Sequence, residues 1–287
     1  MAGLHLQTIL APIRKSIRAF RQKDFTIEGL DERILVLFIG SPRTGSTLLG
    51  QILNYHPQCL ISTEVSLASK IIVHNECPRD LLKTVKANAM ETFETGLENT
   101  SSMERATYQA RWISFKDLAG DPKFTKKPIK VIGDKKAGGT AKCAESHREA
   151  FVSFVRVNRF IKLLQIVRDP VGAAMSLMKS HKIDDFEQAC SEIVRLTNVG
   201  HMVANEFPDR HHVTYYEDLL TKPEIVIYDL LNFLDLKYDK HWLTKICEKI
   251  NTELPSHADD RSENHEKIAQ NIISKFRAEY IFARYYI

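Results

Sequence analysis

The sequence contains little cysteine and no metal-binding pattern. Its 287 residues include five cysteines, and no two of them form a CxxC pair. They are dispersed along the chain: Cys59, Cys77, Cys143, Cys190 and Cys247. An odd and dispersed set predicts neither a zinc site nor a disulfide framework. Because reduced thiols are typical of the cytoplasm, we expect a cytoplasmic protein that needs no metal.

Long apolar runs are also missing. No stretch approaches the roughly 20 apolar residues that a membrane-spanning helix needs, and no apolar segment precedes a small-residue cleavage site, so a secretory signal is not predicted. Residues 1–23 carry five basic residues and no acidic one. For the basic amphipathic segment 1–30, one interpretation is a membrane-surface helix or a transit peptide. The other, which we favour, is a helix docked on the domain.

Charge of one sign is only slightly in excess. The formal net charge is +4, and 44% hydrophobic and 26% charged residues are ordinary for a globular protein. No tract reaches the density of a basic nucleic-acid-binding arm, so we predict no nucleic-acid partner. A small polyanionic ligand explains the same surplus. The sequence also lacks internal repeats and linkers, which favours a single domain over residues 1–287.

The clearest strand in the sequence is the apolar run 34–39, ILVLFI. A continuous run rich in branched residues predicts a parallel strand that is buried on both faces. It ends at Gly40, and a helical pattern of leucine and isoleucine follows over 48–53, before Pro57. Strand, glycine-bearing loop and helix form the opening of a nucleotide-binding α/β unit.

Strands and helices alternate along the rest of the chain. We predict strands over 129–132, 160–167 and 212–216 and a helix over 225–236, whereas 65–127 is polar and helix-prone. This alternation predicts an α/β fold with three layers, α/β/α, around a central, mainly parallel sheet. The expected architecture is similar to that of P-loop NTPases.

The loop 40–47, GSPRTGST, has the outline of a phosphate-binding loop. Glycine lets the backbone approach an anion closely, and amides at the start of the following helix favour negative charge. A triphosphate-binding loop would read GxxxxGK[ST]. Here Ser46 stands where that lysine would be, and Arg43 is the only cation in the loop. The loop is therefore expected to bind an anion other than a magnesium-bound triphosphate.

Residues 42–49, PRTGSTLL, resemble the 5′-phosphosulfate loop of sulfotransferases that use 3′-phosphoadenosine-5′-phosphosulfate (PAPS). That loop usually has a basic residue followed by SGTT or SGST, and arginine at the basic position is similar to the carbohydrate and protein-tyrosine branches. The resemblance implies that Arg43 stabilises charge on the bridging oxygen as the S–O bond breaks. It also assigns four residues to the 5′-phosphate: Thr44, Gly45, Ser46 and Thr47.

A second motif follows the strand predicted over 160–167. Arg168 stands at the strand end with Ser176 eight positions later, which resembles the family's 3′-phosphate motif. Asp169 suits an N-cap and Pro170 a first helical position, so Ser176 would lie nearly two turns into the helix. Arginine supplies a forked phosphate contact and serine a neutral donor. The alternative is an ion pair between Arg168 and Asp169 beside a packing serine.

The segment 216–219, YEDL, resembles a third motif of the family, which is largely architectural. Two interpretations of Tyr216 remain open, a nucleotide contact and a core tyrosine whose hydroxyl finds a partner. We include Tyr216 in the predicted nucleotide site. Residues 261–267 loosely resemble the loop that closes over the nucleotide in relatives.

Sulfuryl transfer needs a base for the acceptor and positive charge for the leaving group. Glu64 follows Arg43 by 21 residues, at the end of an apolar stretch. The protein-tyrosine branch has its catalytic glutamate at a similar distance, so the resemblance makes Glu64 the general base. Apolar neighbours are expected to raise the pKa of Glu64. The alternatives are a surface carboxylate at this position and His56 as the base.

Lys135, in the segment 133–136 (GDKK), resembles the lysine of a D-K-x-P motif that approaches the transferred sulfonate in the family. Ala137 replaces the proline, so Lys136 stays an alternative to Lys135, which we favour. Two adjacent lysines in a solvated loop are the plain interpretation. Arginine, lysine and backbone amides suffice for a sulfonate, so we expect no metal.

The resemblance as a whole implies a sulfotransferase that moves a sulfuryl group from PAPS to an acceptor hydroxyl by in-line displacement and releases adenosine 3′,5′-bisphosphate (PAP). We favour a carbohydrate or glycolipid acceptor and expect the variable helical insert 70–128 to line its site. One alternative is a nucleotide kinase, which would need a loop lysine and a strand-end aspartate. The other is a catalytically inactive module that binds PAPS or PAP.

Overall fold

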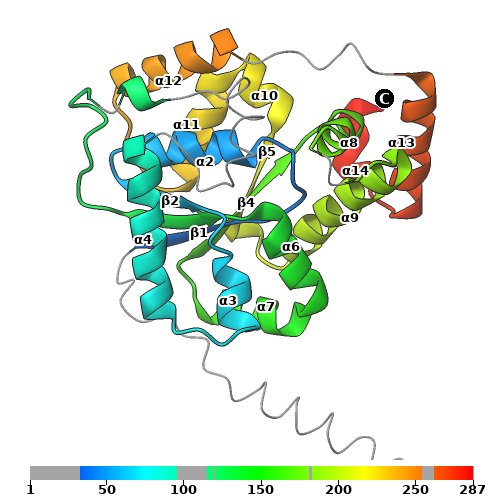
Figure 1. Cartoon of the computed structure of the whole chain (residues 1–287), viewed down its shortest axis with the longest axis horizontal. Helices are drawn as coiled ribbons and strands as arrows, with labels where there is room; N and C mark the ends of the chain where they lie inside the picture. The colour runs from blue at the N-terminus through cyan, green and yellow to red at the C-terminus, as the bar shows by residue number, and fades with distance from the viewer. Residues whose placement is uncertain (1–32, 96–114, 119, 181–182, 254–261, 287) are drawn as a thin grey trace, which may run out of the picture.

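Five parallel strands form a sheet at the centre of the structure, which is a computed structural model (Figure 1). The structure describes five stretches of the chain: 33–95, 115–118, 120–180, 183–253 and 262–286. The basic segment 1–30 and part of the insert 70–128 lie outside the described residues, so the interpretations of the N-terminal segment stay predictions.

The strands do not follow one another in space in their sequence order. In sequence order they are: β1 (Ile34–Phe38), β2 (Cys59–Thr63), β3 (Val131–Lys135), β4 (Ile161–Val167) and β5 (His211–Tyr215). In space the order is β2-β3-β1-β4-β5, and every neighbouring pair is parallel. The first strand of the sequence is therefore the middle strand of the sheet.

Helices cover both faces of the sheet (Figure 1). One face carries four helices: α2 (Ser46–Tyr55), α10 (Tyr216–Thr221), α11 (Pro223–Phe233) and α12 (Lys240–Glu253). The other face also carries four: α3 (Leu67–Ile72), α6 (Ala137–Ser146), α7 (Arg148–Val157) and α9 (Phe186–Ala204). These layers confirm the predicted three-layer α/β/α architecture.

The remaining helices lie beside these layers. The long helix α4 (Pro78–Thr95) packs along the edge strand β2 (Figure 1). A third hydrophobic cluster joins the N-terminal half of α9 to three more helices: α8 (Pro170–Met178), α13 (Glu263–Lys275) and α14 (Glu279–Phe282). Among the described residues, short 3₁₀ turns occur at three places: η1 (Lys116–Leu118), η2 (Pro208–Arg210) and η4 (Ala283–Tyr285).

Strand β1 is buried on both faces, as its continuous apolar sequence predicts. Leu35 and Leu37 pack into the cluster with α3, α6, α7 and α9, whereas Val36 and Phe38 pack into the cluster with α2 and α11. Because side chains alternate between the two faces of a strand, both faces need apolar residues when helices cover both. Burial of β1 thus fixes the middle of the sheet.

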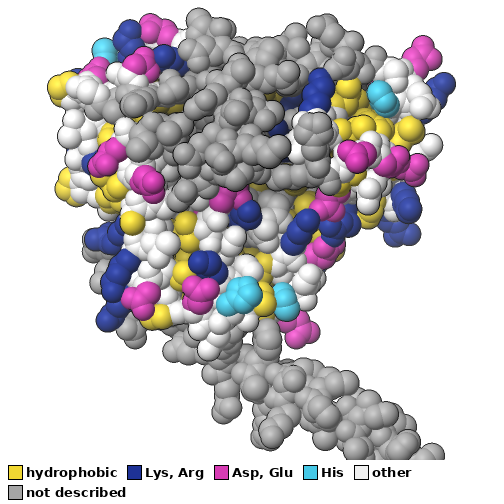
Figure 2. Space-filling view, in the orientation of Figure 1, with side chains coloured by type: hydrophobic (Ala, Val, Ile, Leu, Met, Phe, Trp, Pro, Cys, Tyr) yellow, Lys and Arg dark blue, Asp and Glu magenta, His cyan; other side chains and the backbone are white. Residues whose placement is uncertain are grey.

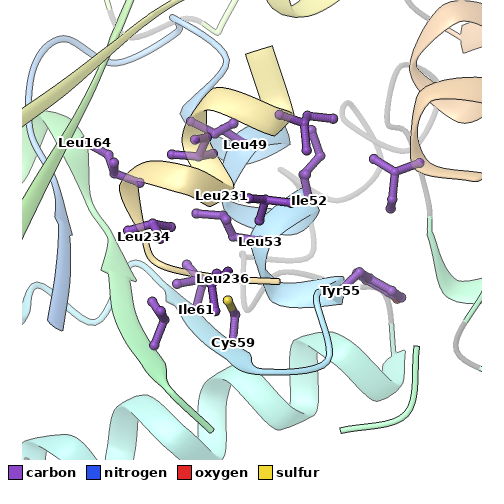
Figure 3. Close-up of a cluster of buried hydrophobic side chains, with 14 of the residues drawn as sticks. Leu49, Ile52, Leu53, Tyr55, Cys59, Ile61, Leu164, Leu231, Leu234 and Leu236 are labelled. Carbon is purple, nitrogen blue, oxygen red and sulfur yellow. The ribbon is translucent and has the colours of Figure 1, made fainter. Parts of the chain in front are cut away.

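Helix α2 lies on the sheet through one apolar side. Leu49, Ile52 and Leu53 pack against the end of α11 and the chain after it, and Ile61 of β2 lies beneath them (Figure 3). Leucine and isoleucine at positions i, i+3 and i+4 fall on one side of a helix, which explains this contact. The packing sets the direction in which the N-terminus of α2 points.

Two predicted elements differ from the structure by two residues or more at each end. The strand predicted over 129–132 is β3, Val131–Lys135, because Gly133 and Asp134 pair with β1 and β2 in the middle of the sheet. Both residue types are rare inside strands, which is why the sequence pattern favours a loop there. The helix predicted over 225–236 is α11, which begins at its proline, Pro223, and ends at Phe233.

Basic and acidic side chains are interspersed on the face that Figure 2 shows, and its described residues form no large patch of one charge. Among the described residues, no helix combines the length and the apolar character that crossing a bilayer requires.

We expect the substitution Gly133→Ala to destabilise the sheet. A Cβ atom at Gly133 would lie 2.8 Å from Ile61 Cδ1 and 2.9 Å from the Val36 carbonyl oxygen, and a backbone atom cannot move aside. The free energy of unfolding should fall by about 2 kcal/mol, measured by chemical denaturation. Gly120→Ala is the matched control, because a Cβ at Gly120 would meet nothing within 4 Å. Equal stability of the two variants would contradict this packing.

Candidate active site

The loop between β1 and α2 adopts a backbone that only a few residue types accept. Gly40 and Gly45 have φ angles of +128° and +93°, and Arg43 has a φ angle of +65°. Glycine adopts positive φ without a steric cost, but for arginine it costs of order 1–3 kcal/mol. Strain of this kind is typical of functional sites, which makes Arg43 a candidate site residue.

Neighbouring elements hold this loop in place. Thr197 of α9 donates a hydrogen bond to the Ser41 hydroxyl (3.1 Å), and the buried Thr44 hydroxyl donates to the Ser41 carbonyl (3.2 Å). Gly138 of α6 lies against Pro42, where a Cβ would be 3.3 Å from the proline Cδ. The Thr44 hydroxyl is therefore already hydrogen-bonded inside the loop, so Thr44 can contribute its backbone amide, and not its hydroxyl, to an anion site.

The amides at the start of α2 have no side-chain cap. Gly45 is the N-cap residue, and the first turn, which contains Ser46 and Thr47, carries no acidic side chain. The N-terminal amides and the helix dipole favour an anion at this end. We call the amides of 44–47 together with Arg43 the first anion site.

Arg168 and Ser176, the second anion site, lie directly beside the first. The Arg43 Nε atom donates to the Ser176 hydroxyl (3.2 Å), and the Arg168 Nη1 atom donates to the Arg43 carbonyl (3.0 Å). Asp169 caps α8 by accepting a hydrogen bond from the Gly172 amide, and Pro170 is the first helical residue, as predicted. Because β1 and β4 are parallel neighbours, both anion sites lie at the carboxyl ends of their strands.

Tyr216 packs between the two anion sites. Its ring lies against Gly45, where a Cβ would be only 2.4 Å from the tyrosine Cδ2, and the Arg168 guanidinium stacks 4.4 Å above the ring centroid. Burial is the main cause that raises the pKa of Tyr216. The Tyr216 ring thus packs against both sites, against Gly45 in the first and Arg168 in the second.

Glu64 meets both lysines of the 133–136 segment. The Lys135 Nζ atom lies 3.0 Å from Glu64 Oε1, and Lys136 pairs with the other carboxylate oxygen. Lys135 is 4% exposed and Glu64 is 36% exposed, so the lysine of the pair is buried and the glutamate reaches the surface. Lys135 ends β3, the strand next to β1, and its side chain packs on Gly50 of α2. Glu64 and Lys135 therefore lie at the same carboxyl edge of the parallel sheet as the first anion site.

The profile of the sulfotransferase family matches residues 36–240, more than two thirds of the chain. The chain belongs to the sulfotransferase family. The match spans both anion sites, Glu64 and Lys135. Sulfuryl transfer is accordingly the class of activity, and the family membership disfavours the kinase alternative.

Solved structures that resemble this sulfotransferase are distant in sequence. STF9 from Mycobacterium avium is 13% identical, with 89% of this chain and 77% of that chain covered and a TM-score of 0.50, which shows the fold alone. The sulfotransferase domain from the curacin biosynthetic pathway (13% identical, 85% and 98% covered, TM-score 0.47) and mouse SULT7A1 complexed with PAP (12%, 85% and 84%, 0.46) are similar too. Among curated protein sequences, none matches the chain.

The expected rise in the pKa of Glu64 is wrong. Burial alone would raise the pKa of this carboxyl, but Lys135 and Lys136 together outweigh burial and lower it. Two cations within ion-pair distance stabilise the carboxylate more than partial loss of water destabilises it. Glu64 of the sulfotransferase is therefore ionised at neutral pH.

His56 does not reach the site. It is the C-cap of α2, at the opposite end from the first anion site, and α2 is about 15 Å long. Its ring is buried against the Lys237 carbonyl and Trp242, and burial lowers the pKa of His56 to about 4. The alternative of His56 as the base is thus excluded.

Asp134 holds the turn that carries Glu64, and sequence reasoning missed this contact. Its buried carboxylate accepts hydrogen bonds from the amides of Val65 and Leu67 (3.1 and 2.9 Å) and from the Ser62 hydroxyl (2.9 Å). These contacts close the turn that holds Glu64 at a φ angle of +63°. The signal in the sequence was an acid directly before Lys135, but its partners come from β2 and the turn after it.

Two other expectations concern regions that are only partly described. Arg261 of the loosely similar segment 261–267 lies outside the described residues, while Ser262 caps α13. The stretch 96–114 of the insert expected to line the acceptor site is also outside. Within the described stretches, no group of three or more His, Cys, Asp or Glu side chains could hold a metal ion.

We predict that Lys136→Gln raises the pKa of Glu64. Lys136 lowers this pKa in the folded protein, so removing its charge must move the pKa towards, or above, its ordinary value. Carbon-detected NMR titration of the glutamate carboxyl measures the shift. Lys142→Gln is the control, because Lys142 lies in α6, the helix that begins directly after Lys136, but pairs with Glu192 (2.7 Å). An unchanged Glu64 titration in Lys136→Gln would contradict the ion pair.

Proposed function

We propose that this sulfotransferase moves a sulfuryl group from PAPS to an acceptor hydroxyl and releases PAP. The observation that carries the proposal is the contact between the two anion sites. Arg43 reaches Ser176 at 3.2 Å and Arg168 reaches the Arg43 backbone at 3.0 Å, so one small molecule with two phosphate groups can touch both. A donor with a 5′-phosphosulfate and a 3′-phosphate has this pattern of charge.

The residues present suit such a donor chemically. The first anion site offers amides and an arginine, which fit a 5′-phosphosulfate. The second offers a forked arginine and a serine hydroxyl, which fit a 3′-phosphate. Ser46 in place of a loop lysine leaves the site without the residue that a triphosphate requires. Tyr216, between the two sites, would lie beside the nucleoside.

The chemistry supplied by the donor is a sulfur atom that forms a bond to the acceptor oxygen while its bond to the bridging oxygen breaks. Arg43 stabilises the negative charge that develops on that bridging oxygen. Glu64 is ionised and partly exposed, so it can take the proton from an acceptor hydroxyl. Lys135 lies between Glu64 and α2, where its ammonium group can pair with a sulfonate oxygen.

We further propose a carbohydrate or glycolipid hydroxyl as the acceptor, because arginine in the loop resembles the carbohydrate branch. The acceptor would approach along the insert 70–128, whose helix α4 packs against β2, the strand that Glu64 follows; there the Asn88 side-chain oxygen accepts a hydrogen bond from the Thr63 amide (2.7 Å). We also propose the cytoplasm as the site of action, since all five cysteines are free thiols.

We predict that PAP binds without magnesium and stabilises the protein. A ligand at 100 times its dissociation constant adds about 2.7 kcal/mol to the free energy of unfolding, which thermal denaturation detects. ATP with magnesium should give no shift. Arg168→Met should abolish the shift by PAP, whereas Arg148→Met, at an exposed ion pair with Glu206, should keep it. A shift by magnesium-ATP and none by PAP would favour the kinase.

We predict that Glu64→Gln strongly slows transfer and leaves donor binding intact. The amide cannot accept the proton, so sulfate transfer from radiolabelled PAPS to an array of sugars, glycolipids, tyrosine peptides and phenols should fall by about 10²–10⁴-fold. The dissociation constant of PAP should change little. Glu76→Gln, at a surface pair with Lys70, is the control that keeps activity. Binding of PAP by the unaltered protein without transfer to any acceptor would favour the inactive module.

A further inference from the structure

Arg284 and Tyr285 fasten the segment 279–285 to the chain that follows β5. The Arg284 guanidinium makes a forked ion pair with Asp218 (2.6 and 2.8 Å) and stacks 4.2 Å from the centroid of the Tyr215 ring. The Tyr285 hydroxyl donates to Glu217 Oε2 at 2.5 Å. In Figure 1 this end of the chain, which includes α14, lies beside α8. None of these contacts belongs to the donor-binding residues described above.

Glu217 connects this segment to the second anion site. While its Oε2 atom accepts from Tyr285, its Oε1 atom accepts from the Asp169 amide at 3.1 Å. Asp169 directly follows Arg168 and caps α8. β4 and β5 are parallel with Val167 beside Tyr215, so Asp169 and Glu217 each lie two residues beyond a paired position. One carboxylate thus bridges the ends of two neighbouring strands.

Tyr216 lies between the residues that the segment grips. Tyr215, Glu217 and Asp218 contact Arg284 or Tyr285, whereas Tyr216 supports Gly45 and the Arg168 guanidinium. The short helix α10 therefore presents one group of side chains to the segment and another to the anion sites.

The Tyr285 hydroxyl is suited to donate a lasting hydrogen bond to Glu217. Burial, followed by the charge of Glu217, raises the pKa of Tyr285 well above its ordinary value, so the hydroxyl keeps its proton over the working pH range. A hydrogen bond to a carboxylate is also among the stronger kinds in proteins. The contact can hold Glu217 against the Asp169 amide at neutral pH.

We propose that Tyr285 is a positioning residue for the donor, which acts through Glu217 to hold Arg168 where the 3′-phosphate binds. This inference rests on the proposed function, since the donor is the molecule that Arg168 would bind. Tyr285 does not touch the donor itself. Its role would appear in donor affinity and not in the chemical step.

The substitution Tyr285→Phe tests the proposal, because it removes one hydroxyl and keeps the ring. We expect the dissociation constant of PAP, measured by calorimetry, and the KM for PAPS each to rise about fivefold or more. The kcat at saturating PAPS should stay within about twofold, since the reacting groups are untouched. Hydrogen exchange of the Asp169 amide in the protein without ligand should become faster.

Tyr280→Phe is the matched control. Tyr280 lies in α14 of the same segment, and its hydroxyl contacts Asn198 at 3.2 Å instead of Glu217. Its removal should change neither PAP binding nor the exchange of the Asp169 amide. The double variant Tyr285→Phe with Glu217→Gln should bind PAP no more weakly than Glu217→Gln alone, because both changes interrupt one chain of contacts.

Two outcomes separate this inference from the proposed function. If the unaltered protein binds PAP and Tyr285→Phe binds it equally well, the inference is overturned and the proposed function stands, even when the melting temperature falls. If the unaltered protein does not bind PAP, the proposed function is overturned and the inference falls with it. Additive effects of Tyr285→Phe and Glu217→Gln on PAP affinity would also overturn the route through Glu217.

Discussion

The parallel pairing of β1 with β3 on one side and β4 on the other is the constraint on which the site depends. It brings the carboxyl ends of three strands to one edge, where Arg43, Lys135 and Arg168 follow or end their strands. In open α/β sheets, ligands bind at the carboxyl ends of the strands, at the point where the connections from two neighbouring strands run in opposite directions. Burial of β1 on both faces stabilises this pairing, so the apolar core and the cationic edge are two consequences of one strand.

Several basic side chains gather at that edge, and two of them share the carboxylate of Glu64. Two arginines and two lysines converge on the site, and Glu64 pairs with both lysines. Surplus positive charge suits a polyanionic donor, while the ionised carboxylate suits a proton acceptor. Arg43 and Glu64 are both held at positive φ, by the glycine loop and by the Asp134 turn respectively. Rigid neighbours of this kind keep reactive side chains in conformations that they would otherwise leave.

Much of the site could be predicted from the sequence, and the misses have a common cause. The loop at Arg43 and the cap at Asp169 depend on local backbone chemistry, which a short motif carries. The pKa of Glu64 depends on lysines about 70 residues away along the chain, so apolar sequence neighbours gave the wrong sign. β3 was misplaced because Asp134 finds its partners on another strand and the turn beyond it.

The sequence alone determined the buried β1 strand, the glycine-bearing loop after it and the three-layer fold, because a continuous apolar run, turn chemistry and the succession of strand and helix patterns each depend on a few neighbouring positions. Only the tertiary structure decided that Arg43 meets Ser176, that both lysines meet Glu64, and that Tyr285 meets Glu217. These contacts join residues 68 to 133 positions apart, and their geometry depends on strand order and helix packing. A linear motif identifies which groups are present, whereas the sheet determines which of them touch.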